Sequence, residues 1–147
     1  MAIKKIACCT DFSDNAEAAF VTALGMAEKY QAKLFVIHVL PPVINPVSTD
    51  IEWALPDVPE QKSLILSLEE RMQQNYGSRL KEDIDCELIV LNGHVSSEII
   101  TFLKDNSVDL VVVGSYGMSG MGLVVFGSVS RRVAHKAPCS VMIVRNT

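Results

Sequence analysis

Hydrophobic residues in this chain gather in five short runs, separated by longer stretches in which apolar and polar positions alternate at helical spacing. Several of the runs are nearly continuous in Val, Ile and Leu, which is typical of strands covered on both faces of a sheet. Strands that alternate with helices indicate a parallel sheet with crossover helices. We expect the strands at Lys4–Cys9, Leu34–Leu40, Cys86–Leu91, Leu110–Gly114 and Ser140–Val144.

The stretches between the runs predict helices, because their apolar residues recur every three or four positions and define one face. These positions fall within residues 16–27, 64–80 and 99–103, and a last helix is expected from about Ser128 to Lys136. The right-handed crossover rule leaves few topologies for such a chain. We therefore predict an α/β fold with a single doubly wound, five-stranded parallel sheet of order 3-2-1-4-5 and helices on both faces.

Composition agrees with this fold and excludes several classes of protein. The 147 residues are the usual size of one domain, so we expect a single domain over residues 1–147. The net charge is −4 and the basic residues are scattered apart from two pairs, which argues against a nucleic-acid surface. No export signal is recognisable and no apolar run approaches the roughly 18 residues that span a bilayer. We predict a cytoplasmic protein without membrane contact.

Neither the cysteines nor the histidines have the spacing of a metal or redox site. The four cysteines lack a Cys-x-x-Cys pair, and we interpret them as reduced, mostly buried thiols. Cys8 and Cys9 are adjacent on one strand and should point to opposite faces. His38 is expected to be a hydrogen-bonded core residue, so we predict no metal site built from the histidines.

A cluster of glycines follows the fourth predicted strand. Five of the eight glycines lie between Gly114 and Ser128. Glycines let the backbone approach a ligand closely and turn its N–H groups toward an anion. We expect Gly127–Ser128 to open a helix whose first amides would favour a phosphate. The alternative is a plain flexible turn, although such connections usually need only about 2 to 6 residues.

The glycine spacing lacks the Gly-x4-Gly-Lys run of a P-loop, and no Gly-x-Gly-x2-Gly follows the first strand. Instead, Gly114-x2-Gly117-x9-Gly127-Ser128 resembles the signature of the nucleotide-binding branch of the universal stress protein family. Similar segments are Cys9–Ser13, His38–Val39, Gly93 with Glu98–Ile99, and Ala137–Val141. The resemblance implies the adenine nucleotide α-hydrolase-like fold and frequent homodimers. It also implies binding of ATP or a related nucleotide such as ADP or AMP, with or without Mg²⁺.

The resemblance also implies which residues contact the nucleotide. Asp11 would accept hydrogen bonds from ribose hydroxyls or help to hold a divalent metal, although it could instead cap the first helix, as could Ser13 or Asp14. Val39 would meet the adenine, although it is also an ordinary strand residue. The full expected set is Cys9, Thr10, Asp11, Val39, Val113, Gly114, Ser115, Gly117, Met118, Ser119, Gly120, Gly127, Ser128, Val129 and Ser130.

One departure from the family pattern concerns charge. Family members often carry a basic residue just after the first or second loop glycine, where this chain has Tyr116 and Met118. The phosphates would then depend more on backbone dipoles and bound metal, which leaves the choice among ATP, ADP and AMP open. Arg131 and Arg132, a turn into the last helix, either compensate for the missing charge or are simply solvated.

Three functions are compatible with these patterns. The first is a nucleotide-binding regulatory module of the stress response that is not an enzyme. The second is a slow ATP-hydrolysing or phosphotransfer enzyme, against which the lack of a loop lysine counts. The third is a ligand-independent dimer that pairs through Ser140–Val144 as an edge strand. The proline-rich segment Pro41–Pro59 is predicted to be a long loop, and its role stays open.

Overall fold

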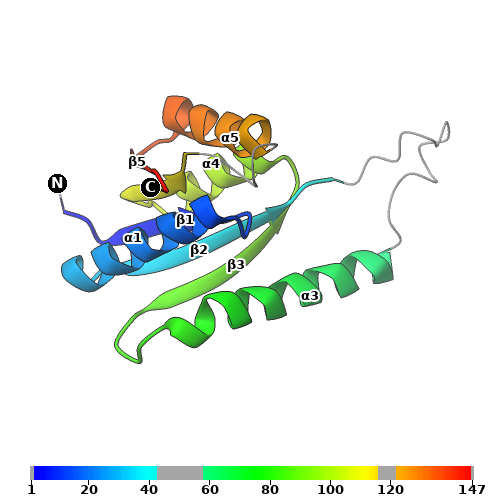
Figure 1. Ribbon diagram of the computed structural model, residues 1–147, viewed down its shortest axis with the longest axis horizontal. Coiled ribbons are helices and arrows are strands. Elements are labelled where there is room, and N and C mark those ends of the chain that lie inside the picture. The colour runs from blue at the N-terminus through cyan, green and yellow to red at the C-terminus, as the bar shows by residue number, and fades with distance from the viewer. Residues whose placement is uncertain (1, 43–57, 116–121, 147) are drawn as a thin grey trace.

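A computed structural model of the chain describes residues 2–42, 58–115 and 122–146. Its centre is a five-stranded parallel sheet in the order β3-β2-β1-β4-β5 (Figure 1). Both the α/β class and the strand order predicted from the hydrophobic runs are confirmed. The strands are β1 Lys5–Cys9, β2 Lys33–Leu40, β3 Cys86–Asn92, β4 Leu110–Gly114 and β5 Ser140–Val144.

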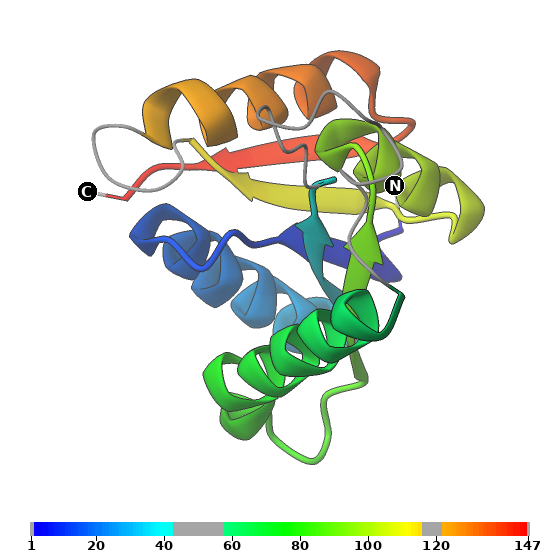
Figure 2. The same ribbon diagram turned by 90° about the vertical axis from the view of Figure 1, so that its right-hand side faces the viewer.

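Helices cover both faces of the sheet, as expected of a doubly wound fold (Figure 2). On one face lie α1, Asp14–Tyr30, and α3, Val58–Asn75, which a short 3-10 helix follows at Gly77–Arg79. On the other face lie α4, Val95–Asp105, and α5, Gly122–Lys136. Because neither face of the sheet is left bare, the strands can be apolar on both sides.

The core consists of two apolar clusters, one on each side of the sheet. The cluster under α1 and α3 contains the fully buried Phe20 and Met72. The cluster under α4 and α5 contains Leu103 and Val133. Cys8 belongs to the first cluster and Cys9 to the second, which confirms that the two thiols point to opposite faces.

Two helices begin earlier than the sequence pattern predicts. Helix α3 starts at Val58, and Pro59 fits there because proline is tolerated in the first turn. The part of the expected Pro41–Pro59 loop that precedes it, residues 43–57, lies outside the described residues.

Helix α5 starts at Gly122, so the prediction that Gly127–Ser128 opens this helix is wrong. The four apolar residues of 123–126 continue a helix as readily as a loop, and Gly127 lies inside it. Only the first four amides of a helix lack an internal partner, and these now belong to residues 122–125. An anion that binds the start of α5 would therefore meet this first turn rather than the Gly127 and Ser128 amides.

Candidate functional site

The turn after β1 carries two of the expected site residues, Thr10 and Asp11, at the carboxyl edge of the sheet. The Thr10 amide donates to the Ile37 carbonyl at 2.8 Å, which extends the β1–β2 pairing. The Ser13 amide donates to Asp11 Oδ1 at 3.0 Å. Ser13 itself is the N-cap of α1, because its hydroxyl accepts from the Ala16 amide at 3.2 Å. Asp11 is therefore not the helix cap; its carboxylate supports the turn at the sheet edge.

Phe12 gives this turn an unusual backbone conformation. Its φ of 66° lies in the left-handed region, which costs a residue with a side chain about 1 to 2 kcal/mol. Its amide donates to Thr10 Oγ1 at 2.9 Å, and its ring centroid lies 4.7 Å from that of His38. The Arg71 guanidinium carbon lies 4.0 Å from the Phe12 ring centroid. Packing from β2 and α3 thus holds the conformation that places Asp11.

His38 is hydrogen-bonded, as expected, although it is half-buried rather than fully enclosed. Its Nδ1 lies 2.9 Å from the Thr10 carbonyl oxygen. A carbonyl can only accept, so Nδ1 carries the hydrogen in this contact. Burial lowers the pKa of His38, while the Thr10 carbonyl and the nearby Asp11 oppose that shift. The ring is therefore a neutral donor near pH 7 that supports the turn.

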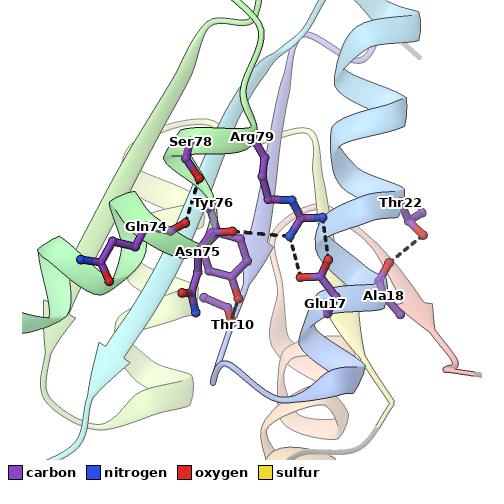
Figure 3. A network of polar contacts seen from close by, with 9 residues as sticks. All are labelled: Thr10, Glu17, Ala18, Thr22, Gln74, Asn75, Tyr76, Ser78 and Arg79. Atoms are coloured by element: carbon purple, nitrogen blue, oxygen red, sulfur yellow. Dashed lines mark hydrogen bonds and ion pairs between the residues drawn. The ribbon is translucent and has the colours of Figure 1, made fainter.

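Tyr76, the residue after α3, reaches the same turn through its hydroxyl (Figure 3). The Tyr76 hydroxyl is hydrogen-bonded to Thr10 Oγ1, and its ring centroid lies 4.6 Å from that of Phe20. Burial raises the pKa of Tyr76, so the hydroxyl stays protonated. Next to it, Arg79 Nη2 lies 2.6 Å from Glu17 Oε1 on α1. These contacts tie the end of α3 to both α1 and the turn after β1.

The end of β4 is packed closely against the start of α1. Val113 is fully buried, and a Cβ on Gly114 would lie 2.8 Å from the Asn15 carbonyl oxygen. Ser115 donates its amide to the Val144 carbonyl at 2.9 Å. Gly114 is thus required by packing, whatever it does for a ligand. Four further expected contacts lie outside the described residues, and their roles stay predictions: Gly117, Met118, Ser119 and Gly120.

A cavity of about 270 Å³ opens beside the end of β2, between the start of α4 and the middle of α5. Val39, near the end of β2, is buried in the core beneath α4 and α5. Two expected site residues, Ser128 and Val129, line this cavity. The complete lining is Pro41, Pro42, His94, Val95, Ser96, Ser128, Val129 and Arg132.

Two other expected contacts are less accessible than their sequence positions suggest. Ser130 is buried, and its hydroxyl donates to the Gly127 carbonyl at 3.1 Å within α5. Cys9 is also buried, and burial raises the pKa of its thiol to about 12. At neutral pH Cys9 is therefore a thiol rather than a reactive thiolate. A ligand would meet the backbone of these two residues rather than their side chains.

The structure therefore places four of the expected residues in two groups at one edge of the sheet: Thr10 and Asp11 in the turn after β1, and Ser128 and Val129 in the cavity between α4 and α5. The sequence pattern did not identify the contacts that Tyr76 and His94 make. Within residues 2–42, 58–115 and 122–146, no three His, Cys, Asp or Glu side chains gather as a metal site. None of the helices described is long and apolar enough to cross a membrane.

Comparison with known proteins gives consistent results for sequence and structure. The model of the Universal stress protein family matches residues 2–145. Universal stress protein YxiE of Bacillus subtilis is 31% identical over 141 residues, which cover 92% of this chain and 94% of that protein. The structure of UspA from Lactobacillus plantarum superposes with a TM-score of 0.77, at 23% identity and 99% coverage of both chains.

Two similar structures were solved with nucleotides. A universal stress protein in complex with cAMP has a TM-score of 0.65 and 23% identity, and 98% of each chain is covered. The Archaeoglobus fulgidus protein in complex with dAMP has a TM-score of 0.65 and 22% identity, and 97% of this chain and 98% of that chain are covered. At these identities the likeness shows a common fold.

Proposed function

We propose that this chain, which belongs to the universal stress protein family, binds an adenine nucleotide at the carboxyl edge of its sheet and acts as a regulatory protein. The observation that carries the proposal is the position of the candidate site. Asp11 follows β1, the glycine-rich segment follows β4, and ligands of such sheets bind at this switch point. Similar proteins were solved with cAMP and dAMP, which supports an adenine nucleotide as the ligand.

The described residues suit parts of a nucleotide. The Asp11 carboxylate is half-buried at the edge of the sheet, where it can accept hydrogen bonds from ribose hydroxyls. The cavity beside β2 combines an apolar wall with serine, histidine and arginine side chains, a combination that suits a base with a phosphate attached. ATP, ADP and AMP, with or without Mg²⁺, are the candidates that the proposal includes.

A regulatory role is favoured over catalysis by the groups near Asp11. Phosphoryl transfer generally needs cations and metal-binding groups around the transferred phosphate. Of the ionisable groups at this turn, His38 interacts electrostatically with Asp11 but is neutral and bonded to a backbone carbonyl, and Arg71 stacks on Phe12. A bound nucleotide would instead act by favouring one conformation of the protein over another. Slow hydrolysis of ATP is the alternative that the binding experiment should also monitor.

Calorimetric titration should detect binding of at least one of ATP, ADP and AMP. At a hundredfold excess over Kd, that nucleotide should stabilise the fold by about 2.7 kcal/mol, which raises the melting temperature by several degrees. Asp11→Asn keeps an oxygen for the Ser13 amide but removes the charge, and we expect it to weaken binding about tenfold.

Asp14→Asn is the matched control, because Asp14 is exposed in the first turn of α1 and should leave affinity nearly unchanged. If the wild-type protein bound none of the three nucleotides with or without Mg²⁺, the proposed function would be wrong. Product analysis of the same samples tests the enzymatic alternative. Turnover typical of kinases, lost in Asp11→Asn, would favour an enzyme.

The edge of the sheet favours self-association as an additional property. Within the described residues, β5 pairs with β4 along one side and is the last strand of the sheet, a position from which a strand can pair with a further strand. Ile143 on this strand is 48% exposed. We therefore include in the proposal a homodimer in which Ser140–Val144 of two chains pair.

Light scattering at micromolar concentration should give twice the monomer mass of 16.1 kDa. Ile143→Lys places a charge on the open strand and should shift the protein toward monomer. Val21→Lys changes a similarly exposed apolar residue on α1, 54% against 48%, and should not. A wild-type monomer, or equal effects of both substitutions, would rule out pairing through β5.

A further inference from the structure

We propose that Arg132 recognises a phosphate of the bound nucleotide in the cavity between α4 and α5, and so supplies the positive charge that the glycine-rich segment lacks. This inference rests on the proposed function and identifies which part of the ligand the cavity holds. Neither Tyr116 nor Met118 carries a charge, so a phosphate near the glycines would depend on backbone dipoles, on bound metal or on a cation from elsewhere in the chain.

The cavity lining is divided into an apolar and a polar part. The apolar part suits a flat ring and consists of Pro41, Pro42, Val95 and Val129. The polar part consists of His94, Ser96, Ser128 and Arg132, and the lining contains no acidic residue. Because the whole chain carries a charge of −4, this local excess of positive charge does not follow from composition. A cavity with these two parts suits an aromatic ligand that carries an anionic group.

The position of Arg132 on α5 lets its side chain contact an anion beside Ser128. The two residues are four positions apart and therefore share one face of the helix. Side chains on a helix lean toward its N-terminus, so Arg132 extends over the turn that carries Ser128. A guanidinium can donate two parallel hydrogen bonds to a phosphate, which a serine hydroxyl alone cannot do.

The start of α4 contributes donors and a favourable field on the opposite wall. Val95 and Ser96 are the first residues of α4, so the positive end of its dipole faces this wall of the cavity. His94 caps the helix, and its Nδ1 accepts from the Ser97 amide at 3.4 Å and lies 2.9 Å from the Ser97 hydroxyl. A neutral ring with Nδ1 as acceptor carries its hydrogen on Nε2, which makes His94 a donor.

Arg131 provides the contrast that makes the inference testable. It is exposed, like Arg132, and has the same charge. Arg131 lines a second, more open hollow on α5, together with Ser128, Arg132, His135 and Lys136, and is not among the residues that line the cavity facing α4. Arg132 lines both this hollow and the cavity that faces α4. A general attraction between α5 and anions would use the two arginines equally, whereas recognition inside the cavity would use Arg132.

The experiment compares adenosine with AMP, which differ by one phosphate, for the wild-type protein, Arg132→Gln and Arg131→Gln. We expect Arg132→Gln to weaken AMP binding about tenfold or more while it changes adenosine binding less than twofold. Arg131→Gln should change both affinities less than threefold. Arg132→Lys keeps the charge without the planar fork and should recover part of the AMP affinity.

The outcomes separate this inference from the proposed function. Suppose that the wild-type protein binds AMP, and that Arg132→Gln either lowers the affinities for AMP and adenosine equally or changes neither of them. Arg132 then does not recognise the phosphate, and only the inference is wrong. Equal losses of AMP affinity in Arg131→Gln and Arg132→Gln would also overturn the inference, because they would indicate a general electrostatic attraction between α5 and anions. If the wild-type protein binds no nucleotide, the proposed function is wrong and the inference is wrong with it. Melting temperatures of the unliganded variants show whether all of them fold.

Discussion

Replacement of Tyr76 by alanine should lower the free energy of unfolding by about 3 to 5 kcal/mol, the range typical of a large aromatic side chain removed from a core. Tyr76 is 2% exposed, packs against Phe20, and bonds Thr10 through its hydroxyl. Its loss leaves a cavity between α1 and the end of α3 and removes a hydrogen-bond partner from the Thr10 side chain. Urea unfolding, followed by circular dichroism, measures the change.

Tyr76→Phe separates the two contributions, because it keeps the ring and removes only the hydroxyl. We expect it to cost about 1 kcal/mol, since Thr10 Oγ1 still accepts from the Phe12 amide. Leu66→Ala on α3 is the control for a side chain that is 61% exposed, and it should change stability by less than about 0.5 kcal/mol. A similar loss in Tyr76→Ala and Leu66→Ala would contradict the packing described for the end of α3.

Gly114→Ala should destabilise the fold by about 1 to 3 kcal/mol, although alanine is a conservative replacement in most places. The new Cβ would lie 2.8 Å from the Asn15 carbonyl oxygen and 2.9 Å from its carbonyl carbon. Both are backbone atoms in the first turn of α1, so neither can swing aside as a flexible side chain would. β4 or α1 must therefore shift. Thermal unfolding in the absence of nucleotide measures the loss without any contribution from a ligand.

Gly25→Ala is the matched control for this substitution. A Cβ on Gly25 would meet no atom within 4 Å, and Gly25 lies in the interior of α1. Alanine is favoured over glycine inside a helix by about 1 kcal/mol, so this variant should be slightly more stable than the wild-type protein. The two substitutions should thus have opposite signs. Equal effects would mean that the contact between Gly114 and Asn15 does not limit the fold.

The hydrophobic pattern was sufficient to predict the strands, because a parallel sheet covered on both faces leaves nearly continuous apolar runs. β4, which is fully buried, was predicted with the bounds that the structure shows. The start of α5 was not predicted, because glycine was interpreted as a boundary although the apolar residues 123–126 permit a helix before Gly127. Local pattern cannot distinguish these alternatives when contacts with other elements decide where a helix begins.

The candidate site was predictable where it follows directly from strand ends, and not where it depends on distant segments. Asp11 could be placed at the sheet edge because it comes two residues after β1. That His94 and Arg132 line one cavity could not be predicted, since His94 caps α4, Arg132 lies on α5, and no periodicity relates them. The bond between Tyr76 and Thr10 was missed for the same reason. A tyrosine on an apolar face has no pattern that identifies the partner of its hydroxyl.

The unequal anchoring of α3 has a consequence for cooperativity. Its end is fixed by the buried Met72 and Tyr76, whereas Leu64 and Leu66 in its first half are exposed. Segments with few buried contacts open at a lower free energy than the core, as separate units of local unfolding. The first turns of α3 can therefore unwind and refold while the last turns stay within the cooperative unit of the sheet. The proline-rich segment therefore leads into the end of α3 that unfolds locally at the lowest free energy.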